Sequence, residues 1–381
     1  MWTQREQVIA LNMVPGIGSL RMRRLVDAFG SLQALWEAPR EALSRVDGIG
    51  PELAHRLDLA RRDEAAVLRE VEAADRLQAS IVTLEEAAYP ATLRTIHDPP
   101  LALYVRGAWR EALDAPCVAV VGSRHASLYG LRIAERLAHD LALRGVTVVS
   151  GMARGIDAAA HRGTLAAAGR TLAVLGSGLG RVYPPEHVDL AGQIIERGGA
   201  LVSEYPMGMP PLAQNFPRRN RVISGLSLGV VVVEAAQCSG ALITADCALE
   251  QGREVFAVPG PVDATTSHGT HELLRQGARL VVSVEDILEE LRLTPQPAVP
   301  AEMADQRAAP LDGPEALLMA QLTVEPTHID ALAASSGLAA DQAAELLLRL
   351  ELRGLIAQRP GKYFVRKDAR PVESGKCKVE S

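Results

Sequence analysis

Between Cys117 and about Leu291, short apolar runs alternate with longer segments in which apolar residues recur at helical spacing. Strands that are apolar throughout are buried on both faces, and their alternation with helices is typical of a mostly parallel sheet covered by helices on each side. The segments Gly130–Ala142 and Ile156–Ala168 are two of the predicted helices. The predicted strands are Cys117–Val121, Val146–Val149, Thr171–Leu175, Ala200–Ser203, Val230–Glu234, Glu254–Val258 and Arg279–Val282.

The first 82 residues follow another pattern, in which short helical stretches are separated by glycine turns. Two of the turns are near copies, Val14-Pro-Gly-Ile-Gly18 and Val46-Asp-Gly-Ile-Gly50, and they have the form of helix-hairpin-helix turns. Glycine lets the chain reverse tightly there, and the helix that follows presents its N-terminal amides to a phosphate. The alternative, which we favour, is a protein-interaction bundle whose hairpins pack against one another.

The C-terminal part reads as a separate domain. Helices near Ala316–Leu322, His328–Ser335 and Asp341–Arg353, then a two-stranded ribbon turning at Gly361-Lys362, predict a winged helix. From Gly313 to Ser381 acidic and basic residues balance at nine each, so no DNA-reading face is evident and a partner-binding role is at least as well supported.

Proline-rich interruptions mark the remaining boundaries. The strand breakers Tyr89-Pro90 and Asp98-Pro-Pro100 precede a short predicted strand, Leu101–Val105. Residues 294–312 are rich in proline and alanine, and their apolar positions show neither the helical nor the strand spacing. This predicts a flexible linker before the winged helix. The expected domains are a helical domain over residues 1–82, an α/β domain over 83–293, a linker over 294–312, a winged helix over 313–367 and a flexible tail over 368–381.

Composition narrows the class of protein. With 48% hydrophobic and 23% charged residues, the chain is ordinary for a globular protein. It has neither a basic N-terminal segment followed by an apolar run nor 18 successive apolar residues, so we expect it in the cytoplasm, without a membrane partner. The residues considered as thiol or metal sites are Cys117, Cys238, Cys247, Cys377, His268 and His271. Their spacing favours reduced thiols and no metal or other cofactor.

The net charge of −6 requires any nucleic-acid binding to depend on a local basic patch. One candidate is Gly122-Ser123-Arg124, a strand-to-helix turn whose amides and guanidinium suit an anion. It lacks the glycines and the acidic partner of a dinucleotide site. Arg154, after the second predicted strand, is expected near Arg124 because parallel strands end at a common edge. The alternative is a structural turn with Arg124 in an ion pair, and Asp157 is assigned a capping or arginine-pairing role.

The segment Phe216-Pro-Arg-Arg-Asn-Arg221 is the most informative one. It combines Phe216 with Arg218, Arg219, Asn220 and Arg221 immediately before a predicted helix. Aromatic residues are only 3% of the chain, so this proline-delimited loop predicts an anion clamp with a ring for base stacking. The alternatives are that Phe216 fills the core and that the arginines are simply solvated.

A third turn, Cys238–Thr244, follows another predicted strand and opens a helix with small residues that approach phosphate closely. Ser239, Gly240 and Thr244 are its candidate ligands. No nucleophile with a positioned base accompanies the turns, and Asp157 and His161 have only the spacing of a helix-face pair. We therefore expect a binding protein and not an enzyme.

Together these motifs resemble the DNA processing protein A family, also called Smf. The resemblance rests on Gly122–Arg124, Ser150–His161, Phe216–Ser227, Ser239–Thr244 and Val258–Gly260. It implies an extended Rossmann-like domain between a SAM-like helix-hairpin-helix domain and a winged helix. It also implies single-stranded DNA in a basic pocket, a homodimer through the Rossmann-like domain, and loading of RecA recombinase onto the DNA in natural transformation and homologous recombination. Single-strand binding protein is a further candidate partner.

Carried over by position, the resemblance assigns phosphate contacts to Ser123 and Arg124 and pocket contacts to Phe216, Arg219, Asn220 and the Ser239–Thr244 turn. His271 departs from it, since asparagine is expected there. Alanine in place of Arg124 or Arg219 is expected to weaken binding and leave the fold intact. The complete predicted DNA-binding set is Gly122, Ser123, Arg124, Arg154, Phe216, Arg218, Arg219, Asn220, Arg221, Ser239, Gly240 and Thr244.

Two other functions compete with this interpretation. A nucleoside monophosphate phosphoribohydrolase of the lysine decarboxylase-like group would use the same sheet edge, but it needs a Pro-Gly-Gly loop and a catalytic glutamate that Cys238–Thr244 does not supply. A duplex-DNA regulator would use the winged helix instead. The arginine cluster lies in the α/β domain, which disfavours that alternative.

Overall fold

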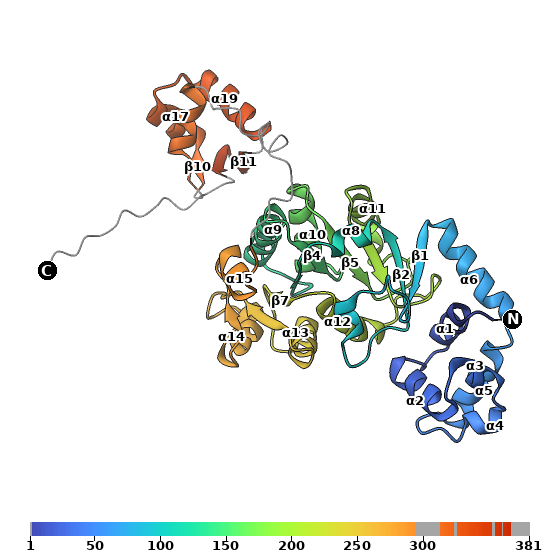
Figure 1. The fold of residues 1–381 in the computed structure, drawn as a ribbon. Helices are drawn as coiled ribbons and strands as arrows, with labels where there is room; N and C mark the ends of the chain where they lie inside the picture. Colours follow the sequence, from blue (N-terminus) through green and yellow to red (C-terminus); the bar gives the residue numbers. More distant parts are fainter. Residues whose placement is uncertain (1, 295–312, 324–325, 353–354, 360, 367–381) are drawn as a thin grey trace. The chain divides into compact units, whose positions relative to one another are not determined.

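The computed structural model describes residues 2–294, 313–323, 326–352, 355–359 and 361–366. It divides into two units, Met1–Val299 and Pro300–Ser381, each considered by itself (Figure 1). The expected linker, apart from residue 294, and the expected tail lie outside the described residues. Within the described part, no helix combines the length and apolar character needed to cross a bilayer.

A nine-stranded sheet forms the centre of the first unit, in the order β1-β2-β6-β5-β4-β3-β7-β8-β9. Neighbours from β6 through β9 are all parallel, while the β1–β2 and β2–β6 pairs are antiparallel. This confirms the mostly parallel sheet. The strands are β1 Ala79–Thr83, β2 Ala102–Gly107, β3 Cys117–Val121, β4 Thr147–Ser150, β5 Thr171–Leu175, β6 Ala200–Ser203, β7 Gly229–Val232, β8 Glu254–Ala257 and β9 Arg279–Leu280.

Strand β1 was not predicted, and the boundary expected at residue 82 falls inside it. Its five residues follow helix α6 (Glu64–Arg76) after only two intervening positions, so its apolar residues merge with the helical pattern. The strand is at the sheet edge and pairs with β2 alone. The segment after the helical domain is therefore already part of the sheet.

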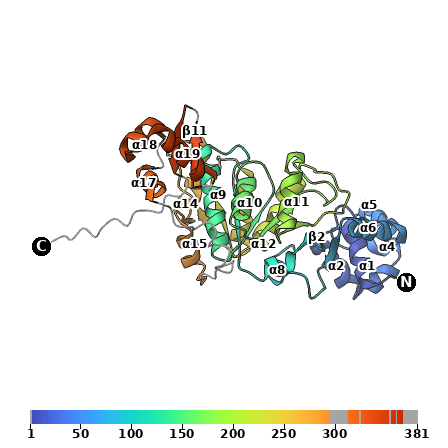
Figure 2. The same cartoon turned by 90° about the horizontal axis from the view of Figure 1, so that it is seen from above.

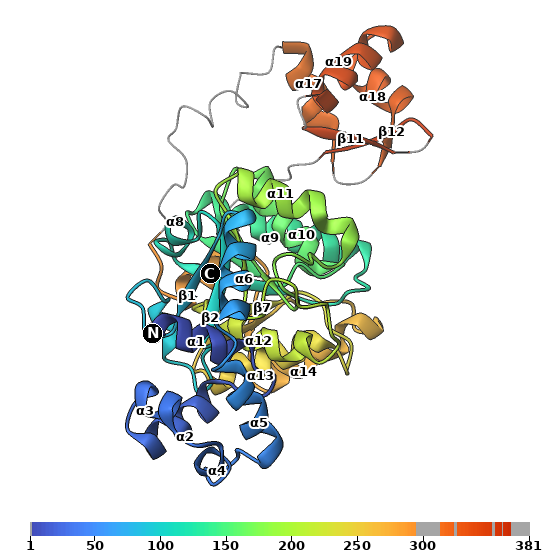
Figure 3. The ribbon, with the colours of Figure 1, turned by 90° about the vertical axis from the view of Figure 1, so that its right-hand side faces the viewer.

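Helices cover both faces of the sheet. Figure 3 shows α9, α10 and α11 on one side and α12, α13 and α14 on the other. Strand β3 supplies both cores: Val118 and Val120 pack with α9 and α10, while Ala119 and Val121 pack with α12 and α13. The helices are α7 Ala91–Arg94, α8 Trp109–Leu113, α9 Leu128–Leu143, α10 Ile156–Ala166, α11 Val188–Glu196, α12 Asn215–Gly225, α13 Gly240–Glu250, α14 His268–Arg275 and α15 Val284–Glu290, with 3-10 turns η1 Pro185–His187 and η2 Thr265–Ser267.

The N-terminal helices have a core of their own and lie at the β1–β2 end of the sheet (Figure 2). The two predicted glycine turns are present: Gly16 and Gly48 have positive φ, and Gly18 and Gly50 directly precede helices α2 and α5. Helix α6 packs on β1. The remaining helices are α1 Gln4–Met13, α2 Ser19–Phe29, α3 Leu32–Glu37, α4 Arg40–Leu43 and α5 Pro51–Ala60.

The second unit is a winged helix, as predicted. Its strands are ordered β10-β12-β11, and the turn before β12 contains Gly361 and Lys362, both with positive φ. The predicted two-stranded ribbon was incomplete because β10, a two-residue strand, is too short to show a period. The elements are α17 Gly313–Gln321, β10 Thr327–His328, α18 Ile329–Ser336, α19 Ala340–Leu352, β11 Ile356–Arg359 and β12 Tyr363–Arg366.

The close packing of α9 and α10 generates a stability prediction. A Cβ on Gly163 of α10 would lie 2.1 Å from the carbonyl oxygen of Glu135 in α9, so the helices meet over a position without a side chain. We expect Gly163→Ala to lower the free energy of unfolding by roughly 1–3 kcal/mol. Gly192→Ala in α11 is the control, because among the described residues no atom outside its own stretch of helix lies within 4 Å of its added carbon. Denaturant titration of both variants measures this, and equal effects would contradict the explanation.

Candidate functional site

The strand order reverses direction beside β3: β4 and β5 lie on one side of it and β7 and β8 on the other. Ligands of such sheets bind where this reversal leaves a crevice at the carboxyl ends of the strands. Helix α9 begins after β3 and α13 begins after β7, so two helix N-termini face this crevice. The backbone N–H of Ser123 donates to the carbonyl of Glu234 at 2.8 Å, which joins the two strand ends.

The loops after β3 and β4 are in direct contact. Gly155 has φ 75°, and a Cβ there would lie 2.2 Å from the carbonyl oxygen of Ser123. That oxygen accepts a hydrogen bond from Ile156 N at 3.2 Å. Only glycine fits both the conformation and the approach. The contact brings Arg124 and Arg154 to one small cavity, as the sequence predicted.

The cavity measures about 20 Å³ and contains an arginine–aromatic cluster. The Cζ of Arg124 lies 5.2 Å from the ring centroid of Phe216, within cation–π distance. The ring of Tyr183 lies 5.6 Å from that of Phe216 and is tilted by 54°. The cavity lining consists of Arg124, Gly151, Ala153, Arg154, Tyr183, Pro184 and Phe216.

Arg154 is half exposed and donates to Glu186 Oε1 at 2.5 Å. Its hydrogen bond to Glu186, with a smaller contribution from Tyr183, raises the pKa of Arg154. Tyr183 was missed by the sequence analysis. It follows the glycine-rich segment Gly176–Gly180 that leaves β5, so the rule applied to the other strand ends, together with the scarcity of aromatic residues, would have found it.

The segment 216–221 is not a loop. It belongs to helix α12, which begins at Asn215, so that expectation was wrong. Pro217 is the third residue of the helix, within the first turn, where N–H groups have no intrahelical acceptor and proline is tolerated. The proline marks the start of the helix and does not delimit a loop.

Arg219 points into the protein. Its side chain donates through Nη1 to Gly151 O at 2.6 Å and also to Val174 O, and the residue is 3% exposed. Burial lowers the pKa of Arg219 to about 10, although the charge of Asp157 opposes the shift. Burial likewise raises the pKa of Asp157, against the charge of Arg219. Arg219 therefore holds the ends of β4 and β5 together beneath the cavity.

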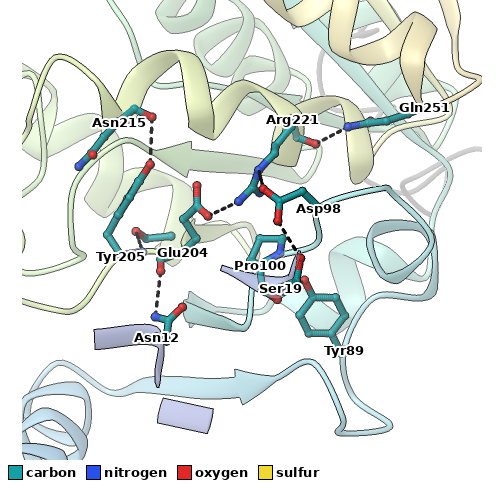
Figure 4. A network of polar contacts seen from close by, with 11 residues as sticks. Asn12, Ser19, Tyr89, Asp98, Pro100, Glu204, Tyr205, Asn215, Arg221 and Gln251 are labelled. Atoms are coloured by element: carbon teal, nitrogen blue, oxygen red, sulfur yellow. Dashed lines mark hydrogen bonds and ion pairs between the residues drawn. The ribbon is translucent and has the colours of Figure 1, made fainter. Parts of the chain in front are cut away.

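The next polar positions of α12 are also occupied. Asn220 is buried and donates to Gly240 O at 3.1 Å, which ties α12 to the start of α13. Arg221 lies between Glu204 and Asp98, with its Nη2 at 2.6 Å from Glu204 Oε2 (Figure 4). Of the arginines in this segment, Arg218 is the exposed one.

The third predicted turn forms as expected around the start of α13. Ser239 is the N-cap and its Oγ accepts a hydrogen bond from Ala241 N at 3.3 Å. Gly240 is exposed, while Thr244 is buried and faces the core. Ser123 also uses its hydroxyl locally, accepting from His125 N at 3.1 Å. Gly122 is partly buried beside Ile156 and Glu234.

Other candidate chemistry has structural partners. His161 is fully buried, its Nδ1 lies 2.7 Å from Thr171 Oγ1, and burial lowers the pKa of His161 to about 3. Asp157 accepts instead from Ala153 N at 3.2 Å. The nitrogen Nε2 of His271 contacts Gly260 O at 3.1 Å. Among the described residues, no three His, Cys, Asp or Glu side chains are grouped to hold a metal, and the described cysteines are free.

A larger hollow of about 550 Å³ lies on the helical unit, by which we mean the N-terminal helices α1–α6, away from the strand ends. Arg24 and Arg45 are among its lining residues, and Arg24 pairs with Asp47 at 2.9 Å. Size alone does not identify a site. The cluster around Phe216 is smaller, but it combines cations and aromatic rings at the edge where such sheets bind ligands.

Known proteins match the chain over most of its length. The family models that match are DNA recombination-mediator protein A over residues 80–292, the DprA winged helix domain over 302–362 and the SAM-like helix-hairpin-helix tandem over 8–63. Protein Smf of Escherichia coli K12 is 48% identical over 288 residues, which are 74% of this chain and 76% of the relative.

Two solved structures are also similar. DNA processing protein A from Streptococcus pneumoniae superposes with a TM-score of 0.66 and 33% identity, covering 76% of this chain and 99% of the other. The Helicobacter pylori protein, whose structure is described in terms of its single-stranded DNA binding mode, has a TM-score of 0.51 and 30% identity, covering 57% of this chain and 96% of the other.

The buried position of Arg219 changes the expectation that its alanine variant keeps the fold intact. We expect Arg219→Ala to lower the free energy of unfolding by roughly 1.5–3 kcal/mol, the range for hydrogen bonds to charged groups. Arg218→Ala, on the exposed side of the same turn, should change it by less than about 0.5 kcal/mol. Denaturant titration separates the two. Equal stabilities would show that the Arg219 contacts contribute little.

Proposed function

The chain belongs to the DNA processing protein A (DprA/Smf) family, and from this premise we propose that it binds single-stranded DNA at the carboxyl edge of its sheet. The strand would be held mainly by its phosphates and passed to RecA recombinase in transformation and homologous recombination. Binding without turnover is part of the proposal, as are a homodimer through the Rossmann-like domain and single-strand binding protein as a further partner.

The observation that carries the proposal is the juxtaposition of Arg124, Arg154, Phe216 and Tyr183 around one cavity. Proteins that bind single strands without reading sequence combine cations for the backbone with aromatic rings on which bases stack. Arg124 and Arg154 are both exposed, but Arg154 is paired with Glu186, so Arg124 is the cation that we expect to meet a phosphate first. The Helicobacter pylori relative, described by its single-stranded DNA binding mode, supports the same class of ligand.

The dimensions of the cavity add a step to binding. A cavity of about 20 Å³ has room for little more than one water molecule, so a base does not fit it as it stands. Arg124 covers the ring of Phe216. We propose that the guanidinium moves from the ring to a phosphate when DNA binds. A single residue would then exchange a cation–π contact for a charge-assisted hydrogen bond and expose the ring to a base.

The first test is a salt titration of binding to a labelled oligothymidylate and to a duplex of equal length. The single strand should bind more tightly, with an affinity that falls steeply as salt rises. Arg124→Ala should weaken it roughly tenfold or more, and Phe216→Ala by at least about fivefold through lost stacking.

Arg170→Ala is the matched control for that titration. Arg170 is exposed but precedes β5, so it lies at the amino edge of the sheet, where it donates to Glu111 O at 3.0 Å. Equal losses in Arg124→Ala and Arg170→Ala would contradict the proposed site. If neither DNA binds, the same variants should be titrated with nucleoside monophosphates, the ligands of the competing enzyme class.

A further inference from the structure

The first glycine hairpin holds a carboxylate from its own chain. Asp98, in the segment between α7 and β2, places Oδ1 2.7 Å from Ser19 Oγ, the first residue of α2. The same oxygen lies 3.6 Å from the point where a Cβ on Gly18 would be. A negative charge is stabilised at a helix N-terminus by the exposed amides and the helix dipole. Asp98 thus brings a carboxylate of the chain itself to the N-terminus of α2, where such a turn would otherwise present its amides to a phosphate.

Asp98 connects this hairpin to helix α12. Its second oxygen lies 3.4 Å from Arg221 Nε, and Arg221 Nη2 lies 2.6 Å from Glu204 Oε2. The carbonyl of Glu204 in turn accepts a hydrogen bond from Asn12 of α1 at 3.1 Å. Figure 4 shows Arg221 between the two acids, with Ser19 below Asp98 and Asn12 below Glu204 in this view. Each acid that pairs with Arg221 is therefore also held by the helical unit.

The pairing is well shielded from water. The side chains of Arg221 and Glu204 are 15% and 11% exposed, and that of Asp98 is 30% exposed. A buried arginine of this kind is unstable without its acids, because an uncompensated buried charge costs several kcal/mol. Arg221 therefore keeps α12 in the one position in which both acids are within reach.

Helix α12 is the element that presents Phe216 to the cavity. Arg221 follows Phe216 by five residues, and its carbonyl accepts from Gln251 Nε2 at 3.0 Å, near the end of α13. A shift of α12 at Arg221 would move the ring of Phe216 relative to Arg124 and Tyr183. The contacts of Arg221 leave its guanidinium turned away from that cavity.

We infer that Arg221 is a positioning residue, and that the N-terminal helices, through the contacts of Ser19 with Asp98 and of Asn12 with Glu204, fix helix α12 for ligand binding at the sheet edge. The helical unit acts here on the fold of the site and not by touching DNA. The inference rests on the proposed function only for its binding readout, since the order of α12 is measurable without DNA.

The first arm of the test is hydrogen exchange of the α12 backbone, which reports local opening. Ser19→Ala should speed exchange of the amides of residues 219–225 by roughly threefold to tenfold, the effect of losing one modest hydrogen bond. Asp98→Asn should speed it by at least as much, because it also removes one of the two acids that face Arg221. Amides of α9 and α10 should keep their rates. The matched controls are Ser44→Ala and Asp47→Asn, whose side chains bond only within the helical unit.

The second arm is affinity for oligothymidylate. Ser19→Ala and Asp98→Asn should weaken it roughly threefold to tenfold, and the controls should not. In a Phe216→Ala background the same substitutions should have almost no further effect, because residues that act through one another are not additive. A general loss of stability would remain additive in that background.

The outcomes separate the inference from the proposed function. Unchanged α12 exchange in Ser19→Ala and Asp98→Asn overturns the inference, and so does faster exchange throughout the first unit or additivity with Phe216→Ala. If α12 exchange rises as expected but the wild-type chain does not bind oligothymidylate, the helical unit still positions α12 and the proposed function fails instead.

Discussion

The buried guanidinium of Arg219 is the contact on which the candidate site depends. It joins the loop after β4, through Gly151 O, to the end of strand β5, through Val174 O. It comes from α12, the helix between β6 on one side of β3 and β7 on the other. Burying a charge is costly unless polar groups pair with it. The two carbonyls accept hydrogen bonds from the Arg219 guanidinium, and the carboxylate of Asp157 offsets its charge. These contacts fix α12, and with it the ring of Phe216, one turn earlier in the helix, beside Tyr183.

The arginines of the site divide into two kinds. Arg124, Arg154 and Arg218 are exposed, whereas Arg219 and Arg221 face Asp157, Glu204 and Asp98 inside the protein. A chain with a net charge of −6 does not attract phosphate over long distances, so the three exposed arginines act on a phosphate mainly at short range. The two buried arginines hold the elements of the site in place. Their charges are compensated internally, and they hold the exposed cations and rings at one edge.

Much of the fold followed from the sequence, because continuous apolar strands and glycine turns leave clear patterns. Three of the predicted strands, β3, β5 and β6, have the expected bounds. The family resemblance, drawn from motifs at the strand ends, is confirmed. Strands β1 and β10 were missed because a short edge strand beside a helix shows no period of its own.

The candidate site was harder to predict, because a sequence shows charge but not burial. Successive residues of a helix are rotated by about 100°, so Arg218, Arg219 and Arg221 point in three directions although they are adjacent in the sequence. The same cluster read as a loop would place all of them in solvent. Tyr183 lies in the irregular segment between β5 and η1, so it is marked only by its place after a strand end and by the scarcity of aromatic residues.

Photo-crosslinking with an oligothymidylate carrying 5-iododeoxyuridine tests the central claim most directly, because it forms adducts with aromatic residues in contact with a base. Mass spectrometry of the digested adduct then locates them. The account predicts adducts at Phe216 or Tyr183. These adducts should be absent from the double variant Phe216→Ala, Tyr183→Leu. Adducts confined to the winged helix or to the N-terminal helices would contradict the proposed placement of DNA at the sheet edge.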